Sequence, residues 1–99
     1  MKYVRLVQFS LGTGKRPAAE AVADKVIPII RKQPGCERAE FFMDDEAGDY
    51  GFFVLWASKQ AADDSYQVVY PIFSAAVAAA EVEGTQSIRT LELYEPKKS

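Results

Sequence analysis

The sequence ERAEFFMDDEAGDYGFFVLWA occupies residues 37–57 and predicts a β-hairpin. Residues 50–57 are mostly aromatic and β-branched, which is typical of a strand, and residues 37–43 end in a similar run. The acidic residues 44–49 between them have the composition of a turn. Gly48 can supply the positive φ that such a loop needs. We therefore expect two antiparallel strands joined by a loop longer than two residues.

A strand and a helix are predicted on each side of this hairpin. Residues 2–11 favour a strand, and the helix after it has Pro17 in its first turn and apolar residues at helical spacing. Pro28 predicts a kink or an early end of that helix. Ser58 is a candidate N-cap for a second helix, which Pro71 should bend or split. Residues 87–95 predict the last strand.

The resulting order, strand–helix–strand–strand–helix–strand, is that of a ferredoxin-like α+β fold. Such a fold has four antiparallel strands with two helices on one face of the sheet. The length of 99 residues suits one domain. We expect that domain to occupy residues 1–95, followed by a polar tail at residues 96–99.

Composition excludes several classes of function. The absence of histidine excludes haem on an axial histidine and any Ser-His or Cys-His catalytic pair, and a single cysteine excludes an internal disulfide. The acidic loop lacks the spacing of a calcium loop, so no metal site is expected. A net charge of −2 argues against a nucleic-acid-binding surface. We see no signal peptide and no apolar run that could span a membrane, and therefore expect a cytoplasmic protein.

The third predicted strand is apolar on both faces. Phe52, Val54 and Trp56 point one way, while Phe53 and Leu55 point the other. Because two helices cover only one face of the sheet, the other face also requires burial. A second copy of the chain, packed sheet against sheet, is the economical solution. The alternative is a monomer whose second sheet face remains exposed as an apolar surface.

Four motifs, spread over most of the chain, carry a family resemblance. They are VxPxxRxQPGC at residues 26–36, FFxD at 41–44, GDY at 48–50 and LWxSxxAA at 55–62. In this order they resemble the antibiotic biosynthesis monooxygenase-like family of dimeric α+β barrels. The resemblance implies a homodimer in which each subunit keeps a cavity between its sheet and its helices.

The same resemblance suggests several activities. Some members of the family oxidise aromatic polyketides with dioxygen and use neither metal nor flavin; others degrade haem, and related folds include isomerases and decarboxylases. The haem-degrading branch is the least similar, because its iron ligand is a histidine on the second helix and this chain contains no histidine. The oxygenases often pair their tryptophan, here Trp56, with an asparagine, and this chain contains no asparagine.

Two residues are candidates for catalysis. The indole N–H of Trp56 could hold a substrate oxygen, or it could bond a backbone carbonyl in an ordinary core. Tyr66 is the best remaining proton handler in a chain without histidine, although packing with its hydroxyl at the surface is as plausible. Tyr70, four residues later on the same helix flank, and Arg5 could stabilise negative charge. Cys36 fits a small buried apolar residue better than a nucleophile.

The predicted pocket walls are apolar and indicate an apolar or aromatic ligand. They comprise Phe52, Val54, Val69 and Phe73. Arg5 and Glu92 could face each other on neighbouring strands, either as part of a polar floor with Gln8 and Thr90 or as a simple salt bridge.

We therefore predict a cofactor-free oxygenase that acts on a small aromatic or enolisable substrate. The alternatives are a non-catalytic dimer that binds a small hydrophobic molecule, and a structural or regulatory partner protein.

Overall fold

The structure, a computed structural model, describes residues 1–80 and 86–97 and has the predicted order of elements. Its described part contains β1 (Tyr3–Ser10), α1 (Arg16–Arg31), β2 (Cys36–Asp44), β3 (Asp49–Trp56), α2 (Lys59–Ala79) and β4 (Ser87–Glu92). The strands form one antiparallel sheet in the order β2-β3-β1-β4. This confirms the ferredoxin-like α+β fold.

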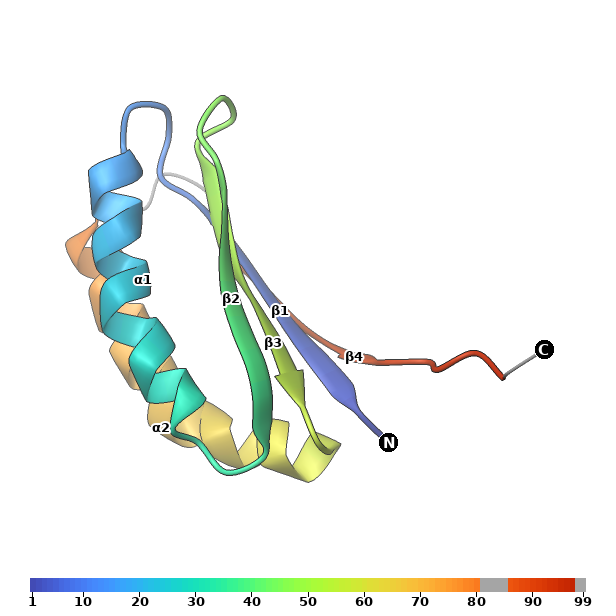
Figure 1. The fold of residues 1–99 in the computed structure, drawn as a ribbon. Helices are drawn as coiled ribbons and strands as arrows, with labels where there is room; N and C mark the ends of the chain where they lie inside the picture. The colour runs from blue at the N-terminus through green and yellow to red at the C-terminus, as the bar shows by residue number, and fades with distance from the viewer. Residues whose placement is uncertain (81–85, 98–99) are drawn as a thin grey trace.

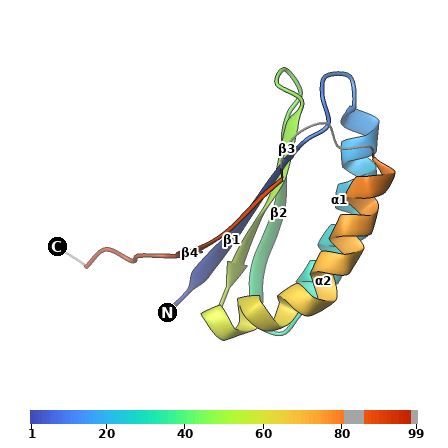
Figure 2. The same ribbon diagram turned by 180° about the vertical axis from the view of Figure 1, so that it is seen from behind.

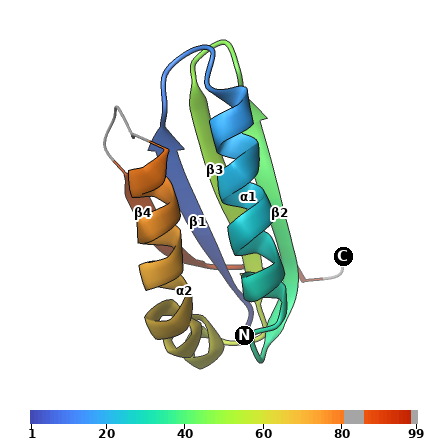
Figure 3. The ribbon, with the colours of Figure 1, turned by 90° about the vertical axis from the view of Figure 1, so that its left-hand side faces the viewer.

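Both helices lie on the same face of the sheet, as Figure 1 shows. In Figure 3, α1 lies in front of β2 and β3, and α2 lies in front of β1 and β4. Neither helix in the described part of the chain is long and apolar enough to cross a membrane.

The two helical prolines act differently from each other. At Pro28 the sequence predicts a kink or an early end; the early end is wrong, because α1 continues to Arg31. Pro28 is exposed, so water can bond the Asp24 carbonyl that lacks its helical donor. Pro71 does not split α2, but the first turns of that helix run at an angle to the rest (Figure 3). The predicted bend is therefore present.

The last strand is shorter than predicted, ending at Glu92 rather than at residue 95. Glu92 lies opposite Tyr3, the first residue of β1, so no strand remains for later residues to pair with. One more backbone bond, from the N–H of Leu93 to the carbonyl of Lys2, closes the ladder at 2.9 Å. The chain then runs away from the sheet (Figures 1 and 2).

An aromatic cluster forms the core between the sheet and the helices. Phe9 of β1 and Phe52 of β3 are both nearly inaccessible to solvent, and Phe73 of α2 meets each of them edge-on. The ring centroids are 5.8 Å apart for Phe9 and Phe73 and 5.7 Å apart for Phe52 and Phe73. This cluster attaches the second half of α2 to the sheet.

The opposite side of the sheet, here called the outer face, also carries apolar side chains. Leu6 and Phe53 lie opposite each other in the register, as do Val4 and Leu55. Leu6, Phe53 and Leu55 remain partly exposed, and no element of the described chain covers them. The strands thus have two apolar faces, as the sequence predicts.

The loop between β2 and β3 is fastened to the loop after β1 through Gly48. Its carbonyl accepts hydrogen bonds from Leu11 (2.9 Å) and Gly12 (3.3 Å), and its φ is +73°. A Cβ at this position would overlap the backbone of Gly12. Gly14 also has a positive φ, +76°, but open space lies around it.

These two glycines form a matched pair for a stability test. We expect Gly14→Ala to cost about 1–2 kcal/mol, the penalty for a left-handed conformation with a Cβ. Gly48→Ala should cost about 1–3 kcal/mol more, because the overlap with Gly12 forces the two loops apart. Urea unfolding of the two variants measures the difference. Equal costs would contradict close contact between the loops.

Candidate functional site

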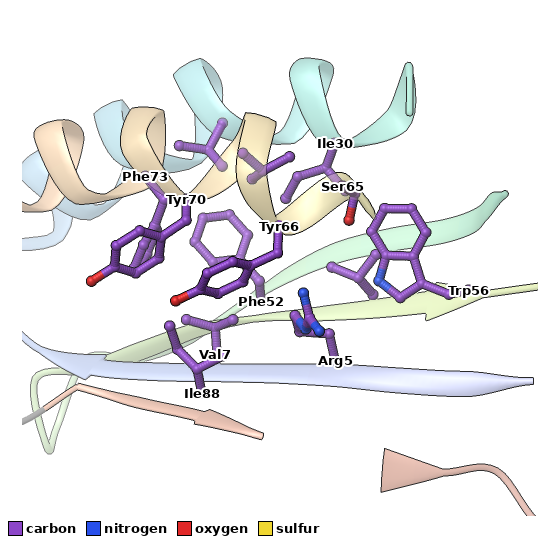
Figure 4. Close-up of a pocket in the computed structure, with 13 residues that line it drawn as sticks. Arg5, Val7, Ile30, Phe52, Trp56, Ser65, Tyr66, Tyr70, Phe73 and Ile88 are labelled. Atoms are coloured by element: carbon purple, nitrogen blue, oxygen red, sulfur yellow. The ribbon is translucent and has the colours of Figure 1, made fainter. Parts of the chain in front are cut away.

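A cavity lies between the sheet and α2, and all eight residues predicted for the site line it (Figure 4). These residues are Arg5, Phe52, Val54, Trp56, Tyr66, Val69, Tyr70 and Phe73. The cavity provides a volume of about 50 Å³ for the centres of water-sized molecules. Five elements line it: β1, β3 and β4 form the floor, and α2 forms most of the facing wall, with a smaller part from α1. The catalytic and binding roles of these residues stay predictions.

Trp56 ends β3 and is buried, with 2% of its surface exposed. Among the described residues, its indole Nε1 has no hydrogen-bond partner. Of the two alternatives for this N–H, the bond to a core carbonyl is not formed. Figure 4 shows the nitrogen on the side of the ring that faces the other cavity residues. Because an unsatisfied buried N–H costs about 1–3 kcal/mol, an acceptor placed in the cavity would recover that free energy.

Arg5 projects from the centre of the sheet into the space beneath α2. Its Nη1 donates to the carbonyl of Ala62 (2.9 Å), and its Nε and Nη2 donate to Oγ1 of Thr90 (3.2 and 3.0 Å). Its Cζ lies 5.2 Å from the ring centroid of Tyr66, a cation–π contact. Arg5 thus joins three elements, β1, α2 and β4.

The predicted pairing of Arg5 with Glu92 is wrong. The register places Thr90 opposite Arg5 and Glu92 opposite Tyr3, whose hydroxyl donates to Glu92 at 3.5 Å. Gln8 is exposed near the end of β1, so it contributes nothing to a polar floor.

The acidic partner of Arg5 is Asp63 on α2, with Nη2 and Oδ1 3.4 Å apart. Lys59 also binds Asp63, at 2.9 Å. The hydrogen bond from Lys59 is the main reason that the pKa of Asp63 lies below its usual value, and the charge of Arg5 contributes further. The carboxylate of Asp63 therefore binds two cations, Lys59 and Arg5. The Arg5 side chain is only 12% exposed, so its positive charge lies beside the cavity. Because Arg5 shares Asp63 with Lys59, this charge is only partly neutralised.

Tyr66 and Tyr70 stack on each other along one flank of α2. Their ring centroids are 5.0 Å apart and their planes differ by 17°. Tyr66 is 40% exposed, so it forms the outer rim of the cavity rather than part of the buried core. Both hydroxyls point away from the indole nitrogen of Trp56 in Figure 4. The polar groups of the two tyrosines therefore do not converge with the indole N–H on one point.

Sequence reasoning missed Ser65, which lines the cavity and is 4% exposed. Its hydroxyl donates to the carbonyl of Ala62 at 2.8 Å, which satisfies it within the helix. Its place three residues after Ala62, on the same helix face, was the available signal. The other lining residues not predicted for the site are apolar: Val7, Val26, Ile30 and Ile88.

Cys36 lies outside the cavity at the start of β2 and is half-buried. Burial raises the pKa of its thiol, so the nucleophilic thiolate is disfavoured at neutral pH.

No cluster of three or more metal-ligating side chains occurs in the part of the chain that the structure describes.

The fold agrees with the comparisons. Residues 2–79 match the model of the family described as "Antibiotic biosynthesis monooxygenase", and the chain belongs to that family. A comparison with the curated proteins gives no match.

Several solved structures share the fold. Rv0793 from Mycobacterium tuberculosis superposes with a TM-score of 0.73 at 17% identity, covering 99% of this chain and 100% of that one. SnoaB from Streptomyces nogalater, described as a cofactor-independent oxygenase, gives 0.74 at 16% identity over 96% of this chain and 95% of its own. A Bacteroides fragilis protein described as dimeric, of unknown function and with a ferredoxin-like fold, gives 0.70 at 13% identity over 93% and 96%.

Proposed function

We propose that this protein is a cofactor-independent monooxygenase that acts on a small aromatic or enolisable molecule. The observation that carries the proposal is the buried indole N–H of Trp56, which has no partner among the described residues and faces a mostly apolar cavity. A ligand oxygen is the natural acceptor for it. Family membership and the fold shared with SnoaB, itself described as a cofactor-independent oxygenase, add support.

The proposed reaction converts a CH₂ group next to an aromatic or carbonyl group into a carbonyl. Loss of one proton gives an enolate, which passes one electron to dioxygen, and the two radicals combine into a carbon–oxygen bond. Protonation gives a hydroperoxide, and loss of water leaves the carbonyl. One oxygen atom enters the product and the other enters water. The substrate supplies all four electrons, so no other reductant is required.

The residues around the cavity have separate roles in this proposal. Trp56 donates its N–H to the enolate oxygen, and the charge of Arg5 stabilises the anion in an environment of low polarity. Tyr66, at the outer rim, passes the proton that the substrate loses on to solvent water, and Tyr70 adds a second hydroxyl there. Phe52, Val54, Val69 and Phe73 exclude water from the anion.

Replacement of Trp56 by phenylalanine tests the proposal. The assay follows oxygen consumption with a panel of enolisable aromatic ketones and phenols, including 2-tetralone and 1-naphthol. We expect Trp56→Phe to lower turnover about 10–100-fold, the effect of losing one hydrogen bond to a charged group. Tyr94→Phe, at a position 66% exposed, is the control and should keep full activity. Full turnover by a folded Trp56→Phe protein would refute the assignment.

We further propose that the protein works as a cytoplasmic homodimer in which residues 1–95 form one domain and residues 96–99 a polar tail. The apolar outer face, which includes Leu6, Phe53 and Leu55, supports the dimer because a second copy can bury it. The dimeric description of the Bacteroides fragilis structure is consistent with this arrangement.

One observation favours a second function, the binding of a small hydrophobic molecule without catalysis. The tyrosine hydroxyls do not converge on the indole N–H, and the remaining walls are mostly apolar. Native mass spectrometry of the gently purified protein distinguishes the two functions. A bound aromatic or lipid-like mass, together with no oxygen consumption across the panel, would favour binding.

A further inference from the structure

We propose that the first half of α2, residues 59–70, is a movable wall of the cavity that is hinged at Pro71 and held closed by Arg5. The proposal rests on the proposed function only in taking this cavity as the ligand site. It concerns how the site admits a ligand, and its test requires neither substrate nor turnover.

The cavity as it stands is too small for the proposed ligand. Its volume is about 50 Å³, whereas a cavity of about 150 Å³ is the size known to take up benzene. Opposite α2, the floor consists of residues of the sheet, including Phe52, Val54 and Trp56, which are fixed by pairing to β1 and β2. The helices are therefore the parts that can move without breaking the sheet, and α2 supplies more of the lining than α1.

The two halves of α2 are anchored differently. After Pro71, Phe73, Ala76 and Val77 are all buried, and Phe73 packs in the aromatic cluster of the core. Before Pro71, only Ala62 and Ser65 are buried, while Tyr66 and Val68 are 40% and 50% exposed. Val69 and Tyr70 are only partly buried against the core. The first half is therefore less firmly anchored than the second, which is typical of segments that open at a lower cost in free energy.

Pro71 lies at the boundary between these halves. It has no N–H, so it removes the helical hydrogen bond to the carbonyl of Gln67. The first turns of α2 already run at an angle to the rest of the helix (Figure 3). Every cavity residue of α2 except Phe73 precedes Pro71: Ser65, Tyr66, Val69 and Tyr70. Bending at Pro71 would move these four residues together and leave the core cluster in place.

Arg5 makes three contacts between the sheet and the first half of α2. It donates to the Ala62 carbonyl at 2.9 Å, reaches Asp63 at 3.4 Å and lies over the ring of Tyr66 at 5.2 Å. Thr90 of β4 fixes the guanidinium from the other side. All three contacts on α2 would break together when the wall opens, so Arg5 is a positioning residue for the cavity.

Two measurements report on the wall directly. Hydrogen exchange resolves residues 59–70 from residues 72–79, and acrylamide quenching reports access to Trp56, the only tryptophan of the chain. We expect Arg5→Gln to speed amide exchange in residues 59–70 about tenfold or more, to leave residues 72–79 unchanged, and to increase quenching of Trp56. Arg38→Gln, an exposed arginine on β2, is the matched control and should change neither.

Two further variants complete the test. Pro71→Ala restores the missing N–H and should slow exchange in residues 59–70. Arg5→Lys keeps the charge but not the forked contacts, so it should fall between the wild type and Arg5→Gln. If Arg5→Gln does not fold, Arg5→Lys and Pro71→Ala decide the question.

Three outcomes would overturn the proposal. The first is that Arg5→Gln speeds amide exchange equally in both halves of α2, and the second is that Pro71→Ala does not slow exchange in residues 59–70. The third is that quenching of Trp56 increases without faster amide exchange, which would assign the opening to rotation of Tyr66 alone. Full turnover in Trp56→Phe, which would refute the proposed function, would leave these results unaffected. The movable wall and the proposed function can therefore fail independently.

Discussion

Replacing Phe73 with alanine is expected to lower the free energy of unfolding by about 3–5 kcal/mol, the usual cost of deleting a buried phenylalanine ring. Phe73 is 4% exposed and contacts Phe9 and Phe52 edge-on. Its removal leaves a space that neighbouring strands cannot fill, because their positions are fixed by backbone pairing. The loss also weakens the attachment of the second half of α2, which then depends on Ala76 and Val77.

Urea unfolding followed by circular dichroism measures this loss at a fixed protein concentration, since association would shift the apparent stability. Val68→Ala is the control on the same helix, because Val68 is 50% exposed. It should stay within about 0.5 kcal/mol of the wild type. A loss below about 1 kcal/mol for Phe73→Ala would mean that the site relaxes freely, contrary to a close-packed aromatic core.

The sequence predicts the architecture well because its signals are local. Three of these signals are single residues with a physical role in a turn or at the start of a helix: Gly48, Pro17 and Ser58. Their roles do not depend on the rest of the fold. Gly48 indeed has a positive φ, Pro17 lies at the start of α1, and the Ser58 hydroxyl accepts from the N–H of Ala61 at 3.1 Å. The apolar periodicities then determine which faces meet.

The contacts of Arg5 were not predictable in the same way. Its pairing depends on the register between β1 and β4, and a shift of two positions exchanges Glu92 for Thr90 as its neighbour. Its contact with Ala62 depends on where α2 crosses the sheet, which residue spacing does not determine. The volume of the cavity likewise depends on how large side chains pack, so the sequence could name the residues around it but not its size.

The order of charged and apolar residues on the outer face supports association of two copies of the chain. Its middle row runs across the sheet from Glu40 on the β2 edge, through Phe53 and Leu6, to Arg89 on β4. A two-fold axis lying between two sheets, parallel to β1, would place the β2 edge of each copy over the β4 edge of the other. Glu40 would then face the partner's Arg89 while the apolar centres packed together. The charges of this row therefore suit a second copy of the same face.

Replacing Phe53 with lysine is expected to convert the proposed dimer into a monomer. Phe53 lies at the middle of the row, and two-fold symmetry brings both introduced charges into one apolar interface, where burial of unpaired ions is prohibitive. Native mass spectrometry and sedimentation at several protein concentrations measure the change. Val68→Lys, on the helical side of the domain, introduces the same charge away from the outer face and should stay dimeric. A wild-type monomer, or a Phe53→Lys variant that remains dimeric, would show that the apolar outer face is not where two copies meet.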